Sequence, residues 1–253
     1  MSNPISGIWY FFKGFSLIFQ PGIRRWVFIP FLINIILLSA LIYYAWLWFP
    51  SVTGFLVGTI EGWLPSWAWM ATLVNWLIWP LVVIFFFLSV FFVFTFLATL
   101  VGEPFNDLLA HAVEQHLTGK PPESPPESIL KIVLGFIVKQ IGKLLYYLKW
   151  FIVLVIISFI PVINIISPLL WFLFGAWLVA LEYADSPLGN HGYKSTVQRQ
   201  ILAQKRMLTL GFGSIVLVMM LIPLLNFFIM PVAVAGMTAM WVDKLAESAP
   251  SQN

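Results

Sequence analysis

The sequence predicts an all-α integral membrane protein: two long transmembrane helices, two proline-broken and partly inserted helical hairpins, an N-terminal interfacial helix and a small helical cytoplasmic cap. Charged residues make up 9% of the 253 residues, whereas soluble domains carry ~25%. Hydrophobic residues make up 61%, and they form runs of about 20 residues or more, the length that crosses a hydrocarbon layer of ~30 Å. The net charge of only +3 does not indicate a nucleic-acid partner. The absence of cysteine excludes disulfides and thiolate metal sites.

Residues 1–21 predict an amphipathic helix that lies at the membrane interface. Its apolar side chains are large, and Lys13 marks the polar side. The first ten positions hold no Lys or Arg, and no small-residue cleavage site follows an apolar block, so the segment does not resemble a secretory signal peptide. An ordinary cytosolic arm is the alternative. The apolar residues are Trp9, Phe11, Phe12, Phe15, Leu17 and Phe19.

Residues 22–50 and 67–101 predict the two long spans. The first contains an apolar run of 25 residues, which corresponds to roughly 37 Å of helix. The second is apolar over 35 residues, or roughly 52 Å, which is too long for one perpendicular crossing. We therefore expect this helix to tilt, to extend beyond the bilayer or to bend at Pro80. The glycine-containing segment 51–66 predicts the turn between the spans.

Two further apolar blocks, 144–183 and 207–242, predict helical hairpins with short legs. Each block is interrupted by two prolines, which leave legs of about 12 to 17 residues, short of a comfortable crossing. The tips, 160–168 and 222–231, hold no charged residue, although a tip in water is expected to carry polar turn residues. We predict that both hairpins enter the membrane and return to the same side. Two ordinary hairpins are the alternative.

The two tips also share a weak internal repeat. Pro161 and Asn164 recur as Pro223 and Asn226, at an offset of 62 residues. Repeats of interrupted membrane segments are typical of transporters, whose sites lie at the repeat interface. A shared hairpin geometry is the alternative explanation for so short a match.

The polar segment 102–143 predicts the cytoplasmic cap. It contains two expected helices, 104–117 and 129–143, joined by the Pro-rich linker 120–128. All 13 basic residues lie in this cap, near the N-terminus, between the hairpins or close to a hairpin end. The positive-inside rule makes that face cytoplasmic, and it predicts that both termini are cytoplasmic.

The segment Gln20-Pro-Gly-Ile-Arg-Arg25 stands directly before the first span. A Pro-Gly pair ends one helix and starts the next, whose first N–H groups lack helical partners and carry the positive end of the helix dipole. The guanidinium forks of Arg24 and Arg25 suit tetrahedral oxyanions. We predict an oxyanion site at Gly22, Ile23, Arg24 and Arg25. The alternative is that the arginine pair binds lipid phosphate or sets the orientation of the helix.

Six other polar residues lie in or near apolar surroundings, where polar groups are costly and often mark an ion path. They are Asn34, Glu103, Asn106, Glu182, Asp185 and His191. Interhelical hydrogen bonding is the alternative for Asn34, and a solvated interfacial position is the alternative for Glu182, Asp185 and His191.

No catalytic, nucleotide-binding or metal-binding motif occurs, so we predict neither an enzyme nor a cofactor or metal site. His111 and His116 lie near Glu114, but their five-residue spacing does not place both histidines on one helix face.

Several of these segments resemble the bacterial CysZ sulfate permeases, and the likeness runs from about residue 6 to residue 242. Its most specific parts are the Pro-Gly-Ile-Arg-Arg segment and the block Pro223-Leu-Leu-Asn-Phe-Phe-Ile-Met-Pro-Val-Ala-Val234. The other matching segments are Phe31-Leu-Ile-Asn34, Glu103-Pro-Phe-Asn106, Glu182-Tyr-Ala-Asp185 and Asn190-His191.

The resemblance implies a bacterial inner-membrane protein that imports sulfate for cysteine biosynthesis, by proton-coupled symport or by channel-like passage. It implies a sulfate site at Gly22, Ile23 and Arg24, with Arg25 adjacent. Ile23 replaces the family's leucine, a change that binding through the backbone N–H would tolerate. The resemblance also implies homo-oligomers. Sulfite and related oxyanions are the expected competitors, and membrane lipids the expected surroundings. The alternative function is a non-transporting membrane protein that binds anionic lipid or organises partners.

Overall fold

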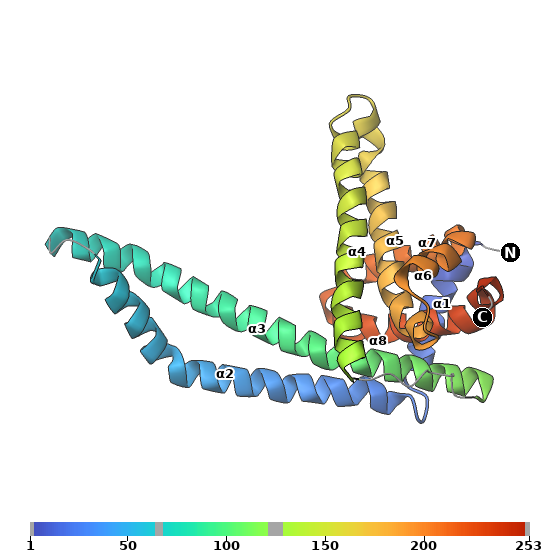
Figure 1. The fold of residues 1–253 in the computed structure, drawn as a ribbon, viewed down its shortest axis with the longest axis horizontal. Helices are drawn as coiled ribbons and strands as arrows, with labels where there is room; N and C mark the ends of the chain where they lie inside the picture. Colours follow the sequence, from blue (N-terminus) through green and yellow to red (C-terminus); the bar gives the residue numbers. More distant parts are fainter. Residues whose placement is uncertain (1–2, 64–67, 121–128, 251–253) are drawn as a thin grey trace. The chain divides into compact units, whose positions relative to one another are not determined.

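The computed structural model describes residues 3–63, 68–120 and 129–250, and within these ranges every regular element is a helix (Figure 1). The prediction of an all-α membrane protein is confirmed. Among the described residues, five segments have the length and apolar composition of a membrane span, and the bent pair α6–α7 would add a sixth. The elements are α1 (Pro4–Leu17), α2 (Arg24–Glu61), α3 (Ala68–Thr118), α4 (Ile129–Ser158), η1 (Ile163–Ile166), α5 (Ser167–Asn190), α6 (Ser195–Gln204), α7 (Arg206–Met219), α8 (Pro223–Met240), η2 (Trp241–Leu245) and η3 (Ala246–Ser248).

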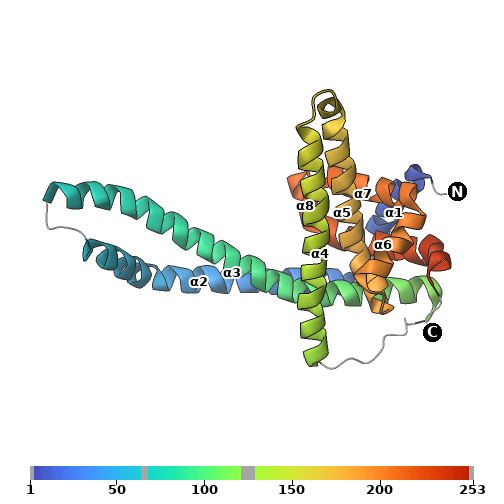
Figure 2. The ribbon, with the colours of Figure 1, turned by 45° about the horizontal axis from the view of Figure 1, so that its top comes forward.

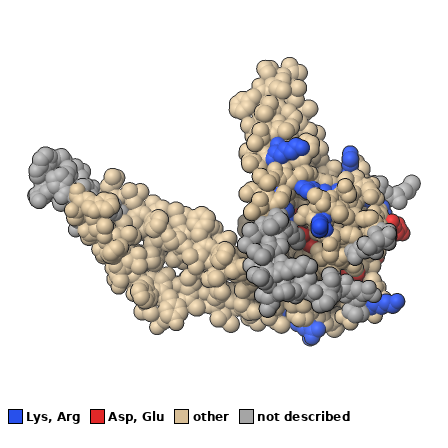
Figure 3. All heavy atoms as spheres, in the orientation of Figure 1, with Lys and Arg blue, Asp and Glu red and all other residues tan. Residues whose placement is uncertain are grey.

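The internal contacts divide the chain into two units. The α2–α3 unit is Phe28–Phe105, and the core unit is Met1–Val27 together with Asn106–Asn253. Only two charged residues occur in the α2–α3 unit, Glu61 and Glu103, and the face of α2 and α3 visible in Figure 3 shows none. Large apolar side chains cover its described surface, as expected for helices in contact with lipid.

Several hydroxyl groups of the α2–α3 unit are satisfied within their own helix. The hydroxyl of Thr53 donates to the carbonyl of Phe49 at 2.7 Å, and Ser89 and Thr95 make the same bond one helical turn back. Such bonds remove the cost of exposing a hydroxyl to hydrocarbon. The rings of Phe49 and Phe86 meet edge to face at 4.9 Å and hold α2 against α3.

Both long helices run further than the sequence indicates. α2 passes through Pro50 to Glu61, so only residues 62–67 separate it from α3. α3 has 51 residues, or roughly 76 Å of helix. It continues through Pro104, so the helix expected over 104–117 is the C-terminal part of α3. Pro is tolerated inside these helices because neighbouring groups in a membrane protein satisfy the carbonyl that Pro leaves unpaired. The Pro-rich linker lies largely outside the described residues.

The core unit is built on very close helix contacts at glycine. α1 packs on α7 and α8, and α5 packs on α7 (Figure 2). A Cβ atom at Gly14 would lie 2.2 Å from the Val232 carbonyl oxygen, and one at Gly213 would lie 1.8 Å from the Ala176 carbonyl oxygen. Small residues at crossings are the usual means by which membrane helices approach closely.

The helix predicted at the N-terminus is confirmed as α1. Tyr10 and Phe11 on its inner face are buried, and Trp9 and Phe12 on its outer face are more than half exposed. Lys13 forms a 2.6 Å ion pair with Asp243 of η2. Burial and the nearby Asp243 raise the pKa of Tyr10 above its ordinary value. The position of this helix at the membrane interface stays a prediction.

Substitution of Gly213 by alanine is expected to lower stability by about 3 kcal/mol, because the added methyl group collides with backbone that cannot turn away. At about 2–4 °C per kcal/mol, thermal unfolding of the detergent-solubilised protein should shift down by roughly 6–12 °C. Gly142→Ala is the matched control, since a Cβ there meets nothing within 4 Å, and alanine favours a helix. Equal midpoints for the two variants would contradict the close packing of α5 on α7.

The first hairpin consists of α4 and α5, which lie side by side in both views (Figures 1 and 2). The predicted break near Pro161 is confirmed, and the tip is exposed and apolar: Phe159, Val162 and Ile165 are each about 80% exposed. Val162 has φ +72°, a conformation that β-branched residues rarely adopt. An exposed apolar tip agrees with a tip in the membrane, and partial insertion stays a prediction.

The second hairpin breaks at a different place from the expected one. α7 ends at Met219 and α8 starts at Pro223, so the turn is residues 220–222, and the predicted tip 222–231 is mostly helix. Pro223 stands at the start of α8, where its missing N–H costs nothing, and Pro231 lies inside the helix. The prediction that Pro231 interrupts the block was therefore wrong.

Candidate anion site and polar clusters

The predicted anion site lies in a short turn, residues 20–25, which is anchored in the core unit and is called the anion turn below. Ile18 before it and Ile23 within it are each 1% exposed, and Val27 after it is 7% exposed. Gly22 has φ +90°, a left-handed conformation that disfavours any residue with a Cβ. The buried side chains hold the turn on the core, and α2 starts two residues after Gly22.

Ile23 has a role that the sequence did not indicate. Its side chain is almost fully buried, and its N–H donates to the Gln20 carbonyl at 3.1 Å. The N–H of Arg24 donates to the same carbonyl, also at 3.1 Å. These two amides are therefore used within the turn, and the guanidinium groups are the donors that point outward. A leucine-to-isoleucine change conserves the volume of such an anchor.

Arg24 and Arg25 are both exposed, and neither has a carboxylate within 4 Å in the described part of the chain. The guanidinium of Arg25 lies 5.0 Å from the ring centroid of Trp26, a cation–π contact that limits its motion. The first turn of α2 contains no acidic residue. Two cations therefore adjoin the positive end of a helix dipole, and an anion would relieve their repulsion.

A second polar cluster joins α4, α5 and α6. The ammonium of Lys143 lies 2.6 Å from Asp185 Oδ2 and 3.2 Å from Glu182 Oε2. The hydroxyl of Tyr147 donates to Glu182 at 3.4 Å, and the amide of Gln198 donates to Asp185 Oδ1 at 3.1 Å. The side chain of Lys143 is 8% exposed and that of Asp185 is 15% exposed. Glu182 and Asp185 are thus partners of a buried cation.

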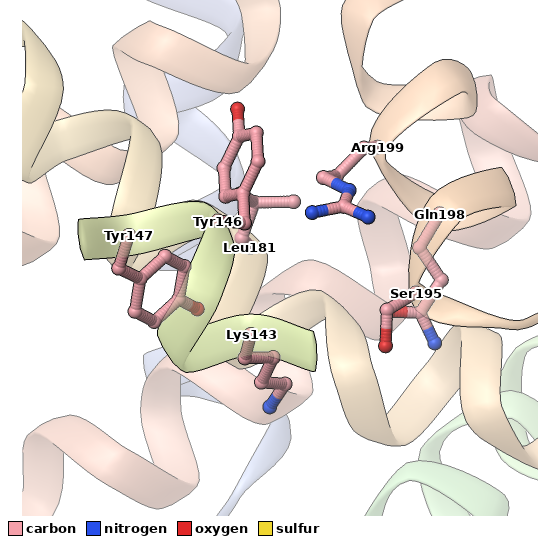
Figure 4. Close-up of a pocket in the computed structure, with 7 residues that line it drawn as sticks. All are labelled: Lys143, Tyr146, Tyr147, Leu181, Ser195, Gln198 and Arg199. Atoms are coloured by element: carbon pink, nitrogen blue, oxygen red, sulfur yellow. The ribbon is translucent and has the colours of Figure 1, made fainter. Parts of the chain in front are cut away.

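Figure 4 shows Lys143, Tyr147 and Gln198 of this cluster beside a small cavity of about 10 Å³ lined by α4, α5 and α6, close to the space that one water molecule needs. Arg199 projects from α6 toward the ring of Tyr146 on α4, with 4.3 Å between its guanidinium carbon and the ring centroid. The indole of Trp177 donates to the hydroxyl of Tyr146 at 3.1 Å.

A third polar cluster surrounds His191. Its Nε2 atom lies 2.9 and 3.0 Å from the two oxygens of Glu114, a residue of α3. Its ring lies 5.2 Å from that of Trp241. The neighbouring Asn190 donates to the Asp107 carbonyl at 2.9 Å. These contacts fasten the end of α5 to the C-terminal part of α3.

The remaining predicted residues lie elsewhere along the chain. Asn34 and Glu103 belong to the α2–α3 unit, and Asn106 is the first residue of the core unit's part of α3. The Oδ1 atom of Asn34 is buried and has no hydrogen-bond partner within the described residues. Within the described residues this oxygen makes no interhelical hydrogen bond, and an unpaired buried oxygen costs ~1–3 kcal/mol.

Lys143 and Gln198 are members of a polar cluster that the sequence did not indicate. Part of the signal was present, because Lys143 and Tyr147 are four residues apart and share a helix face. Glu182 and Asp185 are three apart and also share a face. The charges on these faces are complementary, which would have supported a pairing of α4 with α5.

A family model described as Sulfate transporter CysZ/Etoposide-induced protein 2.4 matches residues 10–231. The matched region contains most of α1, the anion turn, both long helices and the α4–α5 hairpin. It covers more than half of the 253 residues, and it agrees with the resemblance seen in the sequence. The chain belongs to the Sulfate transporter CysZ/Etoposide-induced protein 2.4 family, and it is a multi-pass membrane protein.

Proposed function

We propose that this protein carries sulfate across the bacterial inner membrane and so supplies sulfur for cysteine biosynthesis. The observation that carries the proposal is the arginine pair at the start of α2, exposed and without a carboxylate partner in the described chain. Membership of a sulfate transporter family supports the choice of anion. Sulfate needs such a protein because a bare dianion cannot enter hydrocarbon.

Arg24 and Arg25 supply the energy of capture. Charge-assisted hydrogen bonds contribute ~1.5–3 kcal/mol each, so about four of them, less the cost of ordering two side chains, reach the ~8 kcal/mol of a micromolar complex. Gly22 keeps one side of the turn open, since a Cβ there would meet nothing within 4 Å. Ile23 holds the turn in place.

Asn34, Glu103 and Asn106 are our candidates for the path of the ion. The buried, unpaired oxygen of Asn34 supports this assignment, because an unsatisfied polar atom within an apolar helix is costly to keep. Glu182, Asp185 and His191 form the polar network of the core unit, where each contacts a charged or ionisable group of another helix.

The charge pattern supports a cytoplasmic position for both termini, and hence for the arginine pair. Sulfate would then meet these arginines on the exit side of an importer. Oppositely inserted copies within a homo-oligomer would place the pair on both sides, but the bias of all 13 basic residues to one face argues for a single orientation. Reporter fusions at both termini decide between the two arrangements: activity only on the cytoplasmic side means one orientation.

The test of function is the uptake of radiolabelled sulfate by vesicles that contain the purified protein. Uptake should exceed that of empty vesicles, and excess sulfite should reduce it more than excess chloride. If an imposed proton gradient accelerates uptake, the mechanism is symport; if uptake is unaffected, passage is channel-like. Uptake no faster than in empty vesicles would overturn the proposal. Binding of phosphatidylglycerol without sulfate transport would then support a lipid-binding or partner-organising protein.

A further inference from the structure

A second basic feature of the core unit lies apart from the anion turn. α4, α5, α6 and α7 border a groove of about 620 Å³, within the ~300–1,000 Å³ typical of sites for organic ligands. Arg199 and Tyr146 border both this groove and the small cavity of Figure 4. The lining residues are Tyr146, Trp150, Trp177, Thr196, Arg199, Gln200, Ala203, Arg206 and Leu210.

One face of α6 supplies the polar wall. Thr196, Arg199, Gln200 and Ala203 follow one another at spacings of three, one and three residues, which places them on the same side of a helix. The opposite side of α6 is buried in the core through Ile201 and Leu202, each 0% exposed. The sequence of α6 is therefore amphipathic, and its polar face is turned to the groove.

Two arginines give this wall its charge. Arg199 stacks on Tyr146, and Arg206 Nε donates to the Ala203 carbonyl at 3.2 Å. Neither guanidinium has a carboxylate within 4 Å in the described ranges. Both contacts hold the side chains at the groove and leave N–H donors for an anion.

The other walls are apolar and lead into the membrane segments. On α4 the lining passes from Tyr146 to Trp150, one turn closer to the hairpin tip, and on α7 it passes from Arg206 to Leu210. On each helix the residue nearer the basic wall carries a polar group, Tyr146 or Arg206, and the next lining residue presents a largely apolar side chain. Trp177 lines the groove from α5. Aromatic residues beside basic ones are typical of the interface between headgroups and acyl chains.

We propose that this groove binds the headgroup of an anionic glycerophospholipid. The phosphate lies between Arg199 and Arg206, Thr196 and Gln200 hydrogen-bond the polar part of the headgroup, and an acyl chain follows Trp150 and Leu210. Charge complementarity selects an anion, and the apolar walls select a lipid over an inorganic oxyanion, which would gain nothing from them. This site does not depend on the proposed function of the anion turn.

The test is native mass spectrometry of the full chain in detergent, titrated with phosphatidylglycerol or with phosphatidylcholine. Phosphatidylglycerol should bind more tightly, and Arg199→Gln/Arg206→Gln should weaken its binding about 100-fold or more, the loss expected for two charge-assisted contacts of ~1.5–3 kcal/mol each. Lys120→Gln/Lys194→Gln is the matched control, because it removes the same charge from two exposed lysines outside the groove. This control and Arg24→Ala/Arg25→Ala should both retain the binding.

Millimolar sulfate should not displace the lipid. The proposal is overturned if the two lipids bind equally, if the groove variant and the lysine control lose binding equally, or if sulfate displaces phosphatidylglycerol at constant ionic strength. Arg206→Gln alone tests the site without disturbing the Arg199–Tyr146 contact, since Arg206 is exposed and its described contact is to its own helix end. An unchanged lipid affinity in this single variant also counts against the site.

Discussion

Replacement of both Arg24 and Arg25 by alanine is expected to weaken sulfate binding by about 100-fold or more. Each guanidinium supplies charge-assisted hydrogen bonds of ~1.5–3 kcal/mol, and 1.4 kcal/mol corresponds to a tenfold change in affinity. Neither arginine has a carboxylate partner in the described chain, and both side chains are exposed, so the substitutions leave no buried charge behind. The fold should be unaffected.

Equilibrium binding of radiolabelled sulfate to the purified protein measures the effect, and vesicle uptake gives a second readout. Arg24→Lys should lie between wild type and Arg24→Ala, because lysine keeps the charge but loses the two-pronged geometry. Lys194→Ala, at an exposed residue outside the turn, should bind like wild type. If the double variant keeps its sulfate affinity, the anion turn is not the binding site, whatever the protein transports.

The largest loss of stability is expected from Asp185→Ala, at about 3–5 kcal/mol. The substitution leaves the Lys143 ammonium, 8% exposed, with only Glu182 as a described carboxylate partner. It also removes one of the two acceptors of the Gln198 amide, which still donates to the Tyr193 carbonyl. A buried cation without its closest counter-ion bears the cost of desolvation with little compensation.

Two further variants separate this electrostatic cost from lost packing. Glu182→Ala should cost less than about 1 kcal/mol, because that side chain is 53% exposed and solvent screens its attraction. Lys143→Met/Asp185→Leu should recover most of the stability that Asp185→Ala loses, since it removes both charges together. Thermal and denaturant unfolding in detergent measure the stability of Asp185→Ala, Glu182→Ala and the double variant. Equal costs for Asp185→Ala and Glu182→Ala would show that Lys143 is not buried in the way the structure places it.

Much of the fold follows from local sequence. The apolar runs of α2 and α3 predict membrane helices because their length and lack of charge leave no other way to satisfy the backbone. The turn at Gly22 follows from a Pro-Gly pair. Pro231 shows where prediction from local sequence fails. A proline interrupts a helix only where no neighbouring group compensates for its missing hydrogen bond. Whether such a group is present depends on packing.

The candidate sites also differ in whether their residues are adjacent in the chain or are brought together by packing. The arginine pair belongs to one stretch of six residues, so the sequence alone revealed it. The partners of Glu182, Asp185 and His191 come from helices as far as 77 residues away, and helix register decides which of them meet. The groove beside Arg199 likewise needs four helices at once.

The sequence by itself determined that this chain is a helical membrane protein with a basic turn at the start of its first long helix. These properties depend on hydropathy and on residues adjacent in the chain. Only the tertiary structure decided that Ile23 anchors this turn, that Lys143 neutralises the acids of α5 and that glycines bring α1, α5, α7 and α8 into backbone contact. Such contacts depend on the angles and depths at which helices cross, and those are set by the packing of the whole core.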